Sequence, residues 1–389
     1  MFEPEKLRLN FIDLFSAPRR ALKGKKIATH LMGLILGYIP YLILTYLALL
    51  LAGESLSSTW SRYGLYPFFS LTSSQLSGIA SWIVYILAVI VWLVITLLAA
   101  TVVTRITYKE LKGDPFYSLI GGITFMKRHW RTVVFSPLAV LLIIMFFLLI
   151  AGIMALVGKI PILGGIVFVG LYPLYFFGAI FTIYCVVVLA VLILYLPAIL
   201  AGNEDDALST TFQSYTITWN QPWRIVAYST LIAVLALVGT TFFGWAITAG
   251  YHFINLVFGL PWLMGSSLVP VLAWAEQIVF TGYGYLFTYV PGQLASLSPL
   301  TADINLVYLS GWEKFLGSLL AVLLMLIYGS VLAYGLSIIS VGQSLSFIIF
   351  KLRTDDENLL EREDAEDLDA ECKGEAVIID VEDQESSPI

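Results

Sequence analysis

Charged residues are scarce in this chain, and their scarcity excludes an ordinary soluble fold. Asp, Glu, Lys and Arg together account for 12% of the 389 residues, whereas hydrophobic residues account for 59%. Soluble domains carry about 25% charged residues. Several apolar runs exceed the roughly 20 residues that a helix needs to cross the hydrocarbon core of a bilayer. We therefore expect an all-α integral membrane protein, a bundle of about six transmembrane helices.

Cysteine and histidine are nearly absent as well. The two cysteines, Cys185 and Cys372, lie in an apolar run and in an acidic segment, and the three histidines are scattered. This distribution offers neither a disulfide framework nor zinc-ligand spacing. The sequence also lacks a phosphate-cradling Gly-Lys-Ser/Thr motif and a nucleophile elbow. We therefore assign no catalytic, cofactor-binding or metal-binding residue, and we expect no cofactor and no nucleic-acid partner.

Ionisable residues are missing from five of the six predicted spans, and one carboxylate in the apolar region between the last two spans stands out. Glu276 lies within the apolar sequence VLAWAEQIVF and is the candidate functional residue. A buried glutamate there could hydrogen-bond a substrate or titrate near neutral pH, whereas the alternative is the polar face of an interfacial helix. His30 follows a basic block at the start of the first span, where an interfacial histidine is the simpler interpretation.

Charge is unevenly divided along the chain. Residues 354–389 hold 15 acidic and 2 basic residues, whereas the rest of the chain holds 19 basic and 12 acidic residues. A segment with so much like charge and so little apolar surface cannot form a core. The sequence therefore predicts a membrane domain at 1–352 and an acidic disordered cytoplasmic tail at 353–389. Such a tail is suited to recruiting basic protein partners.

The spans are predicted from apolar runs bounded by charged residues, Gly or Pro. The first run is too long for a signal-peptide core and lacks a small-residue cleavage site, so we interpret it as an uncleaved span. The predicted spans cover about 28–52, 78–104, 133–157, 174–201, 225–250 and 315–342.

Two regions leave the number of crossings open. Residues 160–201 are too long for one straight crossing and barely long enough for two. We favour one crossing, preceded by a short non-crossing helix broken near Pro173. Residues 251–313 are rich in aromatics, Gly and Pro. They form either an aromatic outer cap of re-entrant or interfacial helices or a further helical hairpin, and the interruptions by Pro and Gly favour the cap.

Two amphipathic segments, 114–131 and 206–224, interrupt the apolar runs. Each has an acidic opening, an apolar stripe at helical spacing and a closing Trp-Arg pair. We expect each to be an interfacial amphipathic helix on the cytoplasmic side, with its apolar face at the headgroup boundary and its polar face wet. The predicted membrane-interface residues are Phe116, Ile120, Trp130, Arg131, Leu208, Phe212, Tyr215, Trp219, Trp223 and Arg224.

The distribution of Lys and Arg predicts the orientation of the chain. If the N-terminus, 105–131, 203–224 and everything after Phe350 are cytoplasmic, 18 of the 21 Lys and Arg residues lie inside. An excess of positive charge on the cytoplasmic side is typical of multi-pass proteins. We therefore expect a multi-pass protein of the bacterial inner membrane with both termini in the cytoplasm.

Small residues at four-residue spacing occur in two of the spans. Gly33 and Gly37 form a GxxxG pair in the first span, and Gly329 with Ala333 forms a similar pair in the last. Such pairs allow two helices to approach closely, either within one chain or between chains. The sequence thus leaves a homo-oligomer open.

The order of several segments resembles a known pattern. They are, in chain order, RITYKELKGDPFYSL, HWRTVVFSPL, GKIPILGGIV, PAILAGNEDDALSTTFQSY, PWRIVAYSTL and IIFKLRTDDENL. This succession resembles an uncharacterised family of bacterial polytopic inner-membrane proteins typified by planctomycete-type sequences. More loosely, it is similar to the membrane domain fused to some glycerophosphodiester phosphodiesterases. The resemblance implies a six-helix bundle and carries over no catalytic residue, because the phosphodiesterase chemistry belongs to a separate soluble domain.

Three functions from different classes fit these observations. The first is a non-enzymatic membrane scaffold or assembly protein that contacts membrane lipids and recruits protein partners through its acidic tail. The second is a transporter or channel for an apolar or amphipathic solute, which should show a continuous cavity between spans. The third is a lipid-modifying enzyme, which should show polar groups that converge on Glu276.

Overall fold

The computed structural model describes residues 7–69, 76–260, 262–287 and 309–362. These residues are helical with short connections, and they contain no β-strand. The elements are η1 (Phe11–Ser16), α1 (Ala17–Ala21), α2 (Gly24–Leu51), α3 (Leu56–Tyr63), α4 (Ile79–Leu111), α5 (Leu119–Val157), α6 (Leu163–Asn203), α7 (Ala207–Asn220), α8 (Pro222–Phe258), η2 (Gly265–Ser267), α9 (Leu268–Phe287) and α10 (Gly311–Asp355).

Six of the described helices are long and apolar enough to cross a membrane, so the protein is an all-α, multi-pass membrane protein, as predicted. They are α2, α4, α5, α6, α8 and α10, and the mean hydropathy of their most apolar windows ranges from 2.0 in α8 to 3.2 in α5. Each helix is longer than the span predicted for it. The excess arises because an apolar run marks only the part of a helix that lipid can cover, whereas the backbone hydrogen bonds continue into polar sequence.

Two predicted boundaries are wrong. Helix α6 continues through Pro173, so no separate short helix precedes the fourth span. A proline removes one N–H donor, but in lipid the other backbone groups have no water to bond to and keep their helical partners. Helix α5 begins at Leu119 after the cap residue Ser118 and runs unbroken to Val157. The segment 114–131 is therefore largely the beginning of a span and not a separate interfacial helix.

The region predicted as an outer cap contains one described helix after the end of α8. This helix, α9, follows the short turn η2, and its apolar part, Leu268–Val279, is shorter than the six spanning helices. The remainder of the predicted cap, residues 288–308, lies outside the described residues. The choice between a cap and a helical hairpin therefore stays a prediction.

The chain forms two compact units. The first unit comprises residues 1–14, 104–228 and 343–389, and the second comprises residues 15–103 and 229–342. Three helices, α4, α8 and α10, are each divided between the two units, with one segment in each unit. The two units are described separately below.

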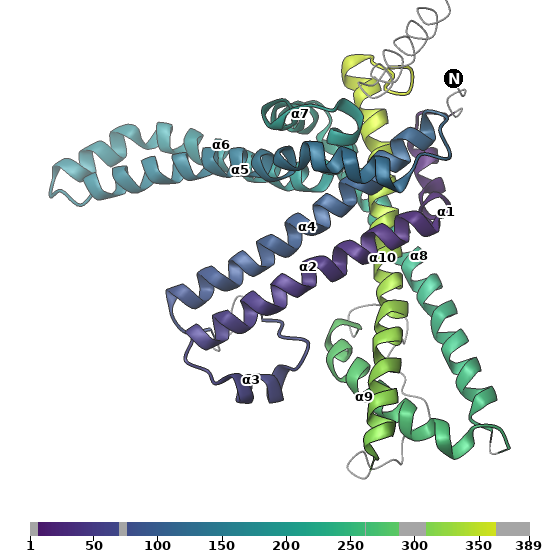
Figure 1. Ribbon diagram of the computed structural model, residues 1–389. Coiled ribbons are helices and arrows are strands. Elements are labelled where there is room, and N and C mark those ends of the chain that lie inside the picture. Colours follow the sequence, from purple (N-terminus) through teal and green to yellow (C-terminus); the bar gives the residue numbers. More distant parts are fainter. Residues whose placement is uncertain (1–6, 70–75, 261, 288–308, 363–389) are drawn as a thin grey trace, which may run out of the picture. The chain divides into compact units, whose positions relative to one another are not determined.

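In the first unit, α5 and α6 form an antiparallel hairpin, and α7 lies along it (Figure 1). Helix α7 ends at Asn220, and α8 begins only two residues later, at Pro222. The C-terminal part of α10 belongs to the same unit. Its Phe350 ring packs against the rings of Tyr195 from α6 and Tyr228 from α8, each at 5.5 Å between centroids.

In the second unit, glycines set the distances between packed helices. A Cβ atom added at Gly33 of α2 would lie 2.4 Å from the Cβ atom of Ala99 in α4, and one added at Gly37 would lie 2.6 Å from the Trp92 ring. A Cβ atom added at Gly329 of α10 would lie 3.0 Å from Leu31 of α2. The small-residue pairs predicted from the sequence thus serve close packing within the chain.

Candidate functional site

Glu276 of α9 is buried in the second unit, with an exposed fraction of 1%. The hydroxyl of Tyr251 in α8 donates a 2.5 Å hydrogen bond to Glu276 Oε1. Tyr328 of α10 is also buried, and its ring meets the Tyr251 ring edge to face at 6.5 Å between centroids. Three helices therefore meet at this carboxylate.

The position of Glu276 on its helix explains its burial. Leu272, Ala275 and Val279 are buried at helical spacing around it, so Glu276 lies in the middle of the inward face of α9. The apolar residues Ala321 and Leu324 of α10 belong to the same cluster. The alternative predicted from the sequence, a wet polar face of an interfacial helix, is therefore wrong. A carboxylate in such surroundings is costly unless it receives hydrogen bonds.

Two further polar residues lie on the same side of α8 as Tyr251. Thr248 precedes it by three residues and Asn255 follows it by four, and both are buried. The cluster thus combines a carboxylate, two phenols, an amide and a hydroxyl within apolar packing. These groups could hold a small hydrogen-bonding ligand or a proton, and they also tie α8 to α9.

His30 is a second buried polar residue of this unit. Its Nε2 atom lies 3.0 Å from Ser340 Oγ of α10, and both side chains are buried. His30 is therefore packed between α2 and α10, and its position relative to the membrane interface stays a prediction. One signal in the sequence could have indicated this packing: Ser337 and Ser340 recur at helical spacing within an apolar span, and such a polar stripe predicts a polar partner on a neighbouring helix.

In the first unit, Arg105 is a buried charged residue that the pattern of apolar runs did not predict. The predicted second span ends near residue 104, but α4 continues to Leu111, and Arg105 is completely buried. Its guanidinium forms a 2.6 Å ion pair with Glu204 and donates a 2.9 Å hydrogen bond to the Ala201 carbonyl. The charged group also lies 4.4 Å from the centroid of the Phe125 ring, a geometry that is favourable for a cation.

Glu204 reaches Arg105 from an unusual backbone conformation. It caps the C-terminus of α6 with φ 59° and ψ 23°, and its N–H group donates to the Leu200 carbonyl. This left-handed conformation is usually occupied by glycine, because a Cβ atom is strained there by about 1 kcal/mol or more. The ion pair offsets this strain and holds the connection between α6 and α7.

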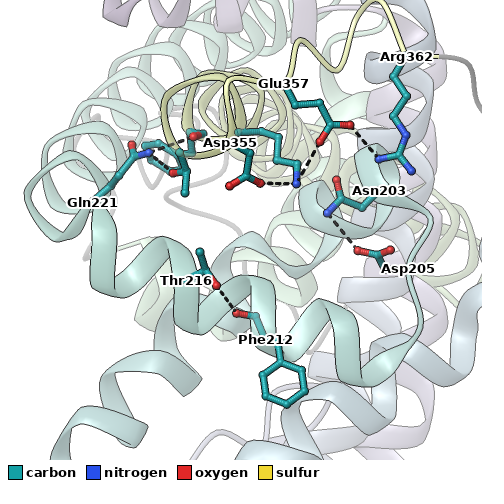
Figure 2. A network of polar contacts seen from close by, with 11 residues as sticks. Asn203, Asp205, Phe212, Thr216, Gln221, Asp355, Glu357 and Arg362 are labelled. Carbon is teal, nitrogen blue, oxygen red and sulfur yellow. Dashed lines mark hydrogen bonds and ion pairs between the residues drawn. The ribbon is translucent and has the colours of Figure 1, made fainter.

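A polar network joins the start of α8 to the end of α10 (Figure 2). Gln221 Nε2 donates a 3.0 Å hydrogen bond to the Phe350 carbonyl and a second hydrogen bond to Thr354 Oγ1. Lys351 forms ion pairs of 2.5 Å with Asp355 and 3.2 Å with Glu357. The network fixes the point at which the chain leaves α10.

The residues that follow α10 fold back onto the end of α4. Leu359 and Leu360 are buried. Tyr108 of α4 donates a 2.7 Å hydrogen bond to the Leu359 carbonyl, and Lys112 Nζ donates one of 2.6 Å to the Arg362 carbonyl. The predicted start of a disordered tail at 353 is therefore wrong, because residues 356–362 are docked. Two consecutive leucines and two hydrogen-bonded carbonyls are enough to order this short stretch.

The predicted interfacial helix 206–224 is helical in its main part. Helix α7 spans Ala207–Asn220, and Asp206 caps it by accepting a hydrogen bond from the Ser209 N–H group. Leu208, Phe212 and Trp219 are exposed and form an apolar stripe on the outer side of the helix.

The opposite face of α7 differs from the prediction. We expected a wet polar face, but the hydroxyl residues Thr210, Thr211, Ser214 and Thr218 are buried where α7 packs against α5 and α6. Burial is possible because several of these hydroxyls donate to carbonyl groups of their own helix, such as Thr211 to Ala207 and Thr218 to Ser214.

The other predicted interface residues belong to α7, α5, the residues before α5, and α8. Tyr215 is half-buried, and its hydroxyl donates to Cys185 Sγ at 3.3 Å. Burial raises the pKa of the Tyr215 phenol, and the contact with Cys185 raises it further. The remaining residues are exposed: Phe116 precedes α5, Ile120, Trp130 and Arg131 belong to α5, and Trp223 and Arg224 belong to the first turn of α8.

Comparison with known proteins places the chain in no family. No family profile, no curated protein and no solved structure matches it. The resemblance to bacterial polytopic inner-membrane proteins therefore stays a prediction.

Proposed function

We propose that the protein is a non-enzymatic membrane scaffold that presents the acidic segment 363–389 to cytoplasmic partners. The observation that supports this proposal is the docked segment 356–362. It is held by the hydrogen bonds from Tyr108 and Lys112 and by the burial of Leu359. An acidic segment that served only solubility would not need the residues before it, 356–362, to be held in place.

The chemistry of the acidic segment indicates the class of partner. Residues 363–389 contain 11 acidic residues and 1 basic residue. Charge of one sign attracts a partner of the opposite sign and speeds its association, most strongly at low salt. We therefore propose a protein with a basic surface as the partner. The docked segment 356–362 would hold the start of the acidic segment beside the membrane and so raise its local concentration there.

Co-purification after cross-linking in cells tests this proposal. We would compare the full chain, a chain without residues 363–389, a chain with every Asp and Glu of 363–389 replaced by Asn or Gln, and a chain with the same residues of this segment in scrambled order. Deletion and neutralisation should remove the same partner, whereas the scrambled segment should retain it. A partner that remains bound to the neutralised chain would contradict the role of charge.

The proposal also places both termini in the cytoplasm of a bacterium. The support is the 18 of 21 Lys and Arg residues that this orientation puts inside. Reporter enzymes that are active on only one side of the membrane, fused at Met1 and at Ile389, test it. Both fusions should report the cytoplasm, and periplasmic activity from either one would overturn this topology.

A second candidate function is favoured by the buried cluster around Glu276. Transport of an amphipathic solute, or its modification, could use a carboxylate that receives a hydrogen bond from Tyr251. Complementation of a deletion strain separates the two functions. A scaffold should complement with Glu276→Gln and fail without residues 363–389. A transporter or an enzyme should show the reverse pattern.

A further inference from the structure

Three exposed cations gather on one face of α5. Arg131 lies four residues after Lys127 and three residues after Arg128. At this spacing its side chain neighbours both of theirs on the helix surface. We call them the cationic triad. No ion pair joins any of the three to a described residue. Like charges at this spacing repel each other, so the arrangement is more stable with a bound anion.

Helix α7 packs against α5, and the three acidic residues just before α7 already have other partners. Glu204 pairs with Arg105, and Asp205 accepts a hydrogen bond from Asn203, as Figure 2 shows for the latter pair. Asp206 caps α7. These carboxylates are therefore committed to the connection between α6 and α7.

An apolar stripe continues from the triad along the same face of α5. Its members follow Arg131 at steps of four and three residues, and all are exposed: Phe135, Leu138, Leu142, Met145 and Leu149. From Phe135 to Met145 the helix rises about 15 Å, which is about half of the 30 Å hydrocarbon core and hence the depth of one leaflet. The stripe thus has the length of the acyl region of a single lipid layer.

The order of these groups matches the order of groups in a phospholipid. The cations come first, at the end of the helix that carries polar sequence, and the apolar stripe follows over one leaflet. Trp130 lies beside the triad, half-exposed, and Arg131 lies 5.9 Å from the centroid of its ring. An indole at this position is typical of the boundary between headgroups and acyl chains.

We propose that this face of α5 binds an anionic phospholipid, with its phosphate on the cationic triad and its acyl chains along the apolar stripe. Basic clusters next to a spanning helix recognise anionic headgroups in this way, with each Lys or Arg contributing about 1 kcal/mol. The proposal concerns lipid recognition by the first unit and is independent of the scaffold function.

Lipid-dependent thermal unfolding in a non-ionic detergent tests the proposal. The lipids are phosphatidylglycerol and phosphatidylcholine with the same 16- and 18-carbon chains. The test variant is Lys127→Gln/Arg128→Gln/Arg131→Gln. The matched control, Arg19→Gln/Arg62→Gln/Lys159→Gln, removes the same charge from three exposed cations that lie on α1, on α3 and between α5 and α6. Native mass spectrometry counts the lipid molecules that stay bound.

Phosphatidylglycerol should raise the Tm of the wild-type chain and of the control more than phosphatidylcholine does. The triple variant should lose this preference, with an apparent affinity for phosphatidylglycerol weaker on the order of a hundredfold. If the triple variant does not fold, Arg131→Gln alone should show an intermediate loss. A six-carbon phosphatidylglycerol should stabilise less, because it covers little of the stripe.

Other occupants of this face predict different results. An equal response of the triple variant and the control would overturn the proposal. Inorganic phosphate that reproduces the whole shift would mean that the acyl chains play no part, which would also overturn it. A response to phosphatidylglycerol that appears only after deletion of residues 363–389 would identify the acidic segment as the natural occupant.

Discussion

Glu204 and Arg105 show how a single buried cation can determine a local backbone conformation. The carboxylate reaches the guanidinium only because its own residue adopts φ 59° at the end of α6. Removing one partner of a buried pair leaves the other charge without compensation, which costs about 3–5 kcal/mol. Replacing both partners by apolar residues avoids that cost.

We therefore predict that Glu204→Gln destabilises the protein by about 3 kcal/mol. The double variant Arg105→Met/Glu204→Leu should lose less than Glu204→Gln. Glu204→Gly should fall between them, because glycine relieves the left-handed strain by about 1 kcal/mol. Thermal unfolding in detergent measures all three. A double variant less stable than Glu204→Gln would show that the pair contributes net stability.

Tyr251 is the residue through which the carboxylate of Glu276 can be tested. Tyr251→Phe removes only the hydroxyl that donates to Glu276 Oε1. A buried acceptor that loses its donor costs about 1–3 kcal/mol, and we predict a loss of that size in thermal unfolding. Tyr172→Phe, at an exposed tyrosine of α6, is the control and should have no effect. Equal thermal stability of the two variants would mean that this hydrogen bond does not stabilise the fold.

At the level of elements, α7 presents its apolar side outward and its hydroxyl side inward. This orientation is the reverse of a helix on a soluble protein and suits one that separates lipid from packed helices. Thr216 donates a 3.0 Å hydrogen bond to the Phe212 carbonyl of the same helix (Figure 2). Ser214 belongs to the buried face.

Three substitutions on α7 introduce the same charge on different faces. Ser214→Asp should be the most destabilising, because it buries an unpaired carboxylate. Phe212→Asp should lower the stability by about 2 kcal/mol in lipid nanodiscs, where we expect Phe212 to contact acyl chains. The loss should be smaller where the side chain is exposed to water. Thr216→Asp, at the edge of the stripe, should cost least. Thermal unfolding in nanodiscs ranks them, and a silent Ser214→Asp would reverse the assignment of the faces.

At the level of the whole molecule, residues 356–362 follow α10 and are docked on α4, and the acidic segment 363–389 comes after them in the sequence. Deleting 363–389 should leave the Tm unchanged. Deleting 356–389 should lower it, because the burial of Leu359 and Leu360 is lost, about 2 kcal/mol for each leucine. Leu359→Ala/Leu360→Ala in the full chain is the matched control and should reproduce most of the loss. Equal stability of the two truncated chains would mean that the docked segment contributes nothing to the fold.

The spanning helices were predictable because each depends on local sequence. An apolar run of sufficient length must be helical in lipid, and no distant partner is needed for it. The same holds for α7, whose start follows from the cap residue Asp206 and whose outer stripe follows from residues at helical spacing. The errors at Pro173 and at 114–131 arose where a signal for interruption was present but lipid or neighbouring sequence kept the helix intact.

The class of the protein, the six spanning helices of its described residues and the apolar stripe of α7 thus follow from the sequence alone. Which polar groups are buried together depends on the packing of distant helices. Arg105 meets a carbonyl 96 residues away, and Tyr108 meets one 251 residues away. Glu276 became a buried acceptor because Tyr251 and Tyr328 arrive from two other helices. Hydropathy and helical periodicity are properties of neighbours along the chain, whereas the pairing of buried polar groups depends on how distant helices pack.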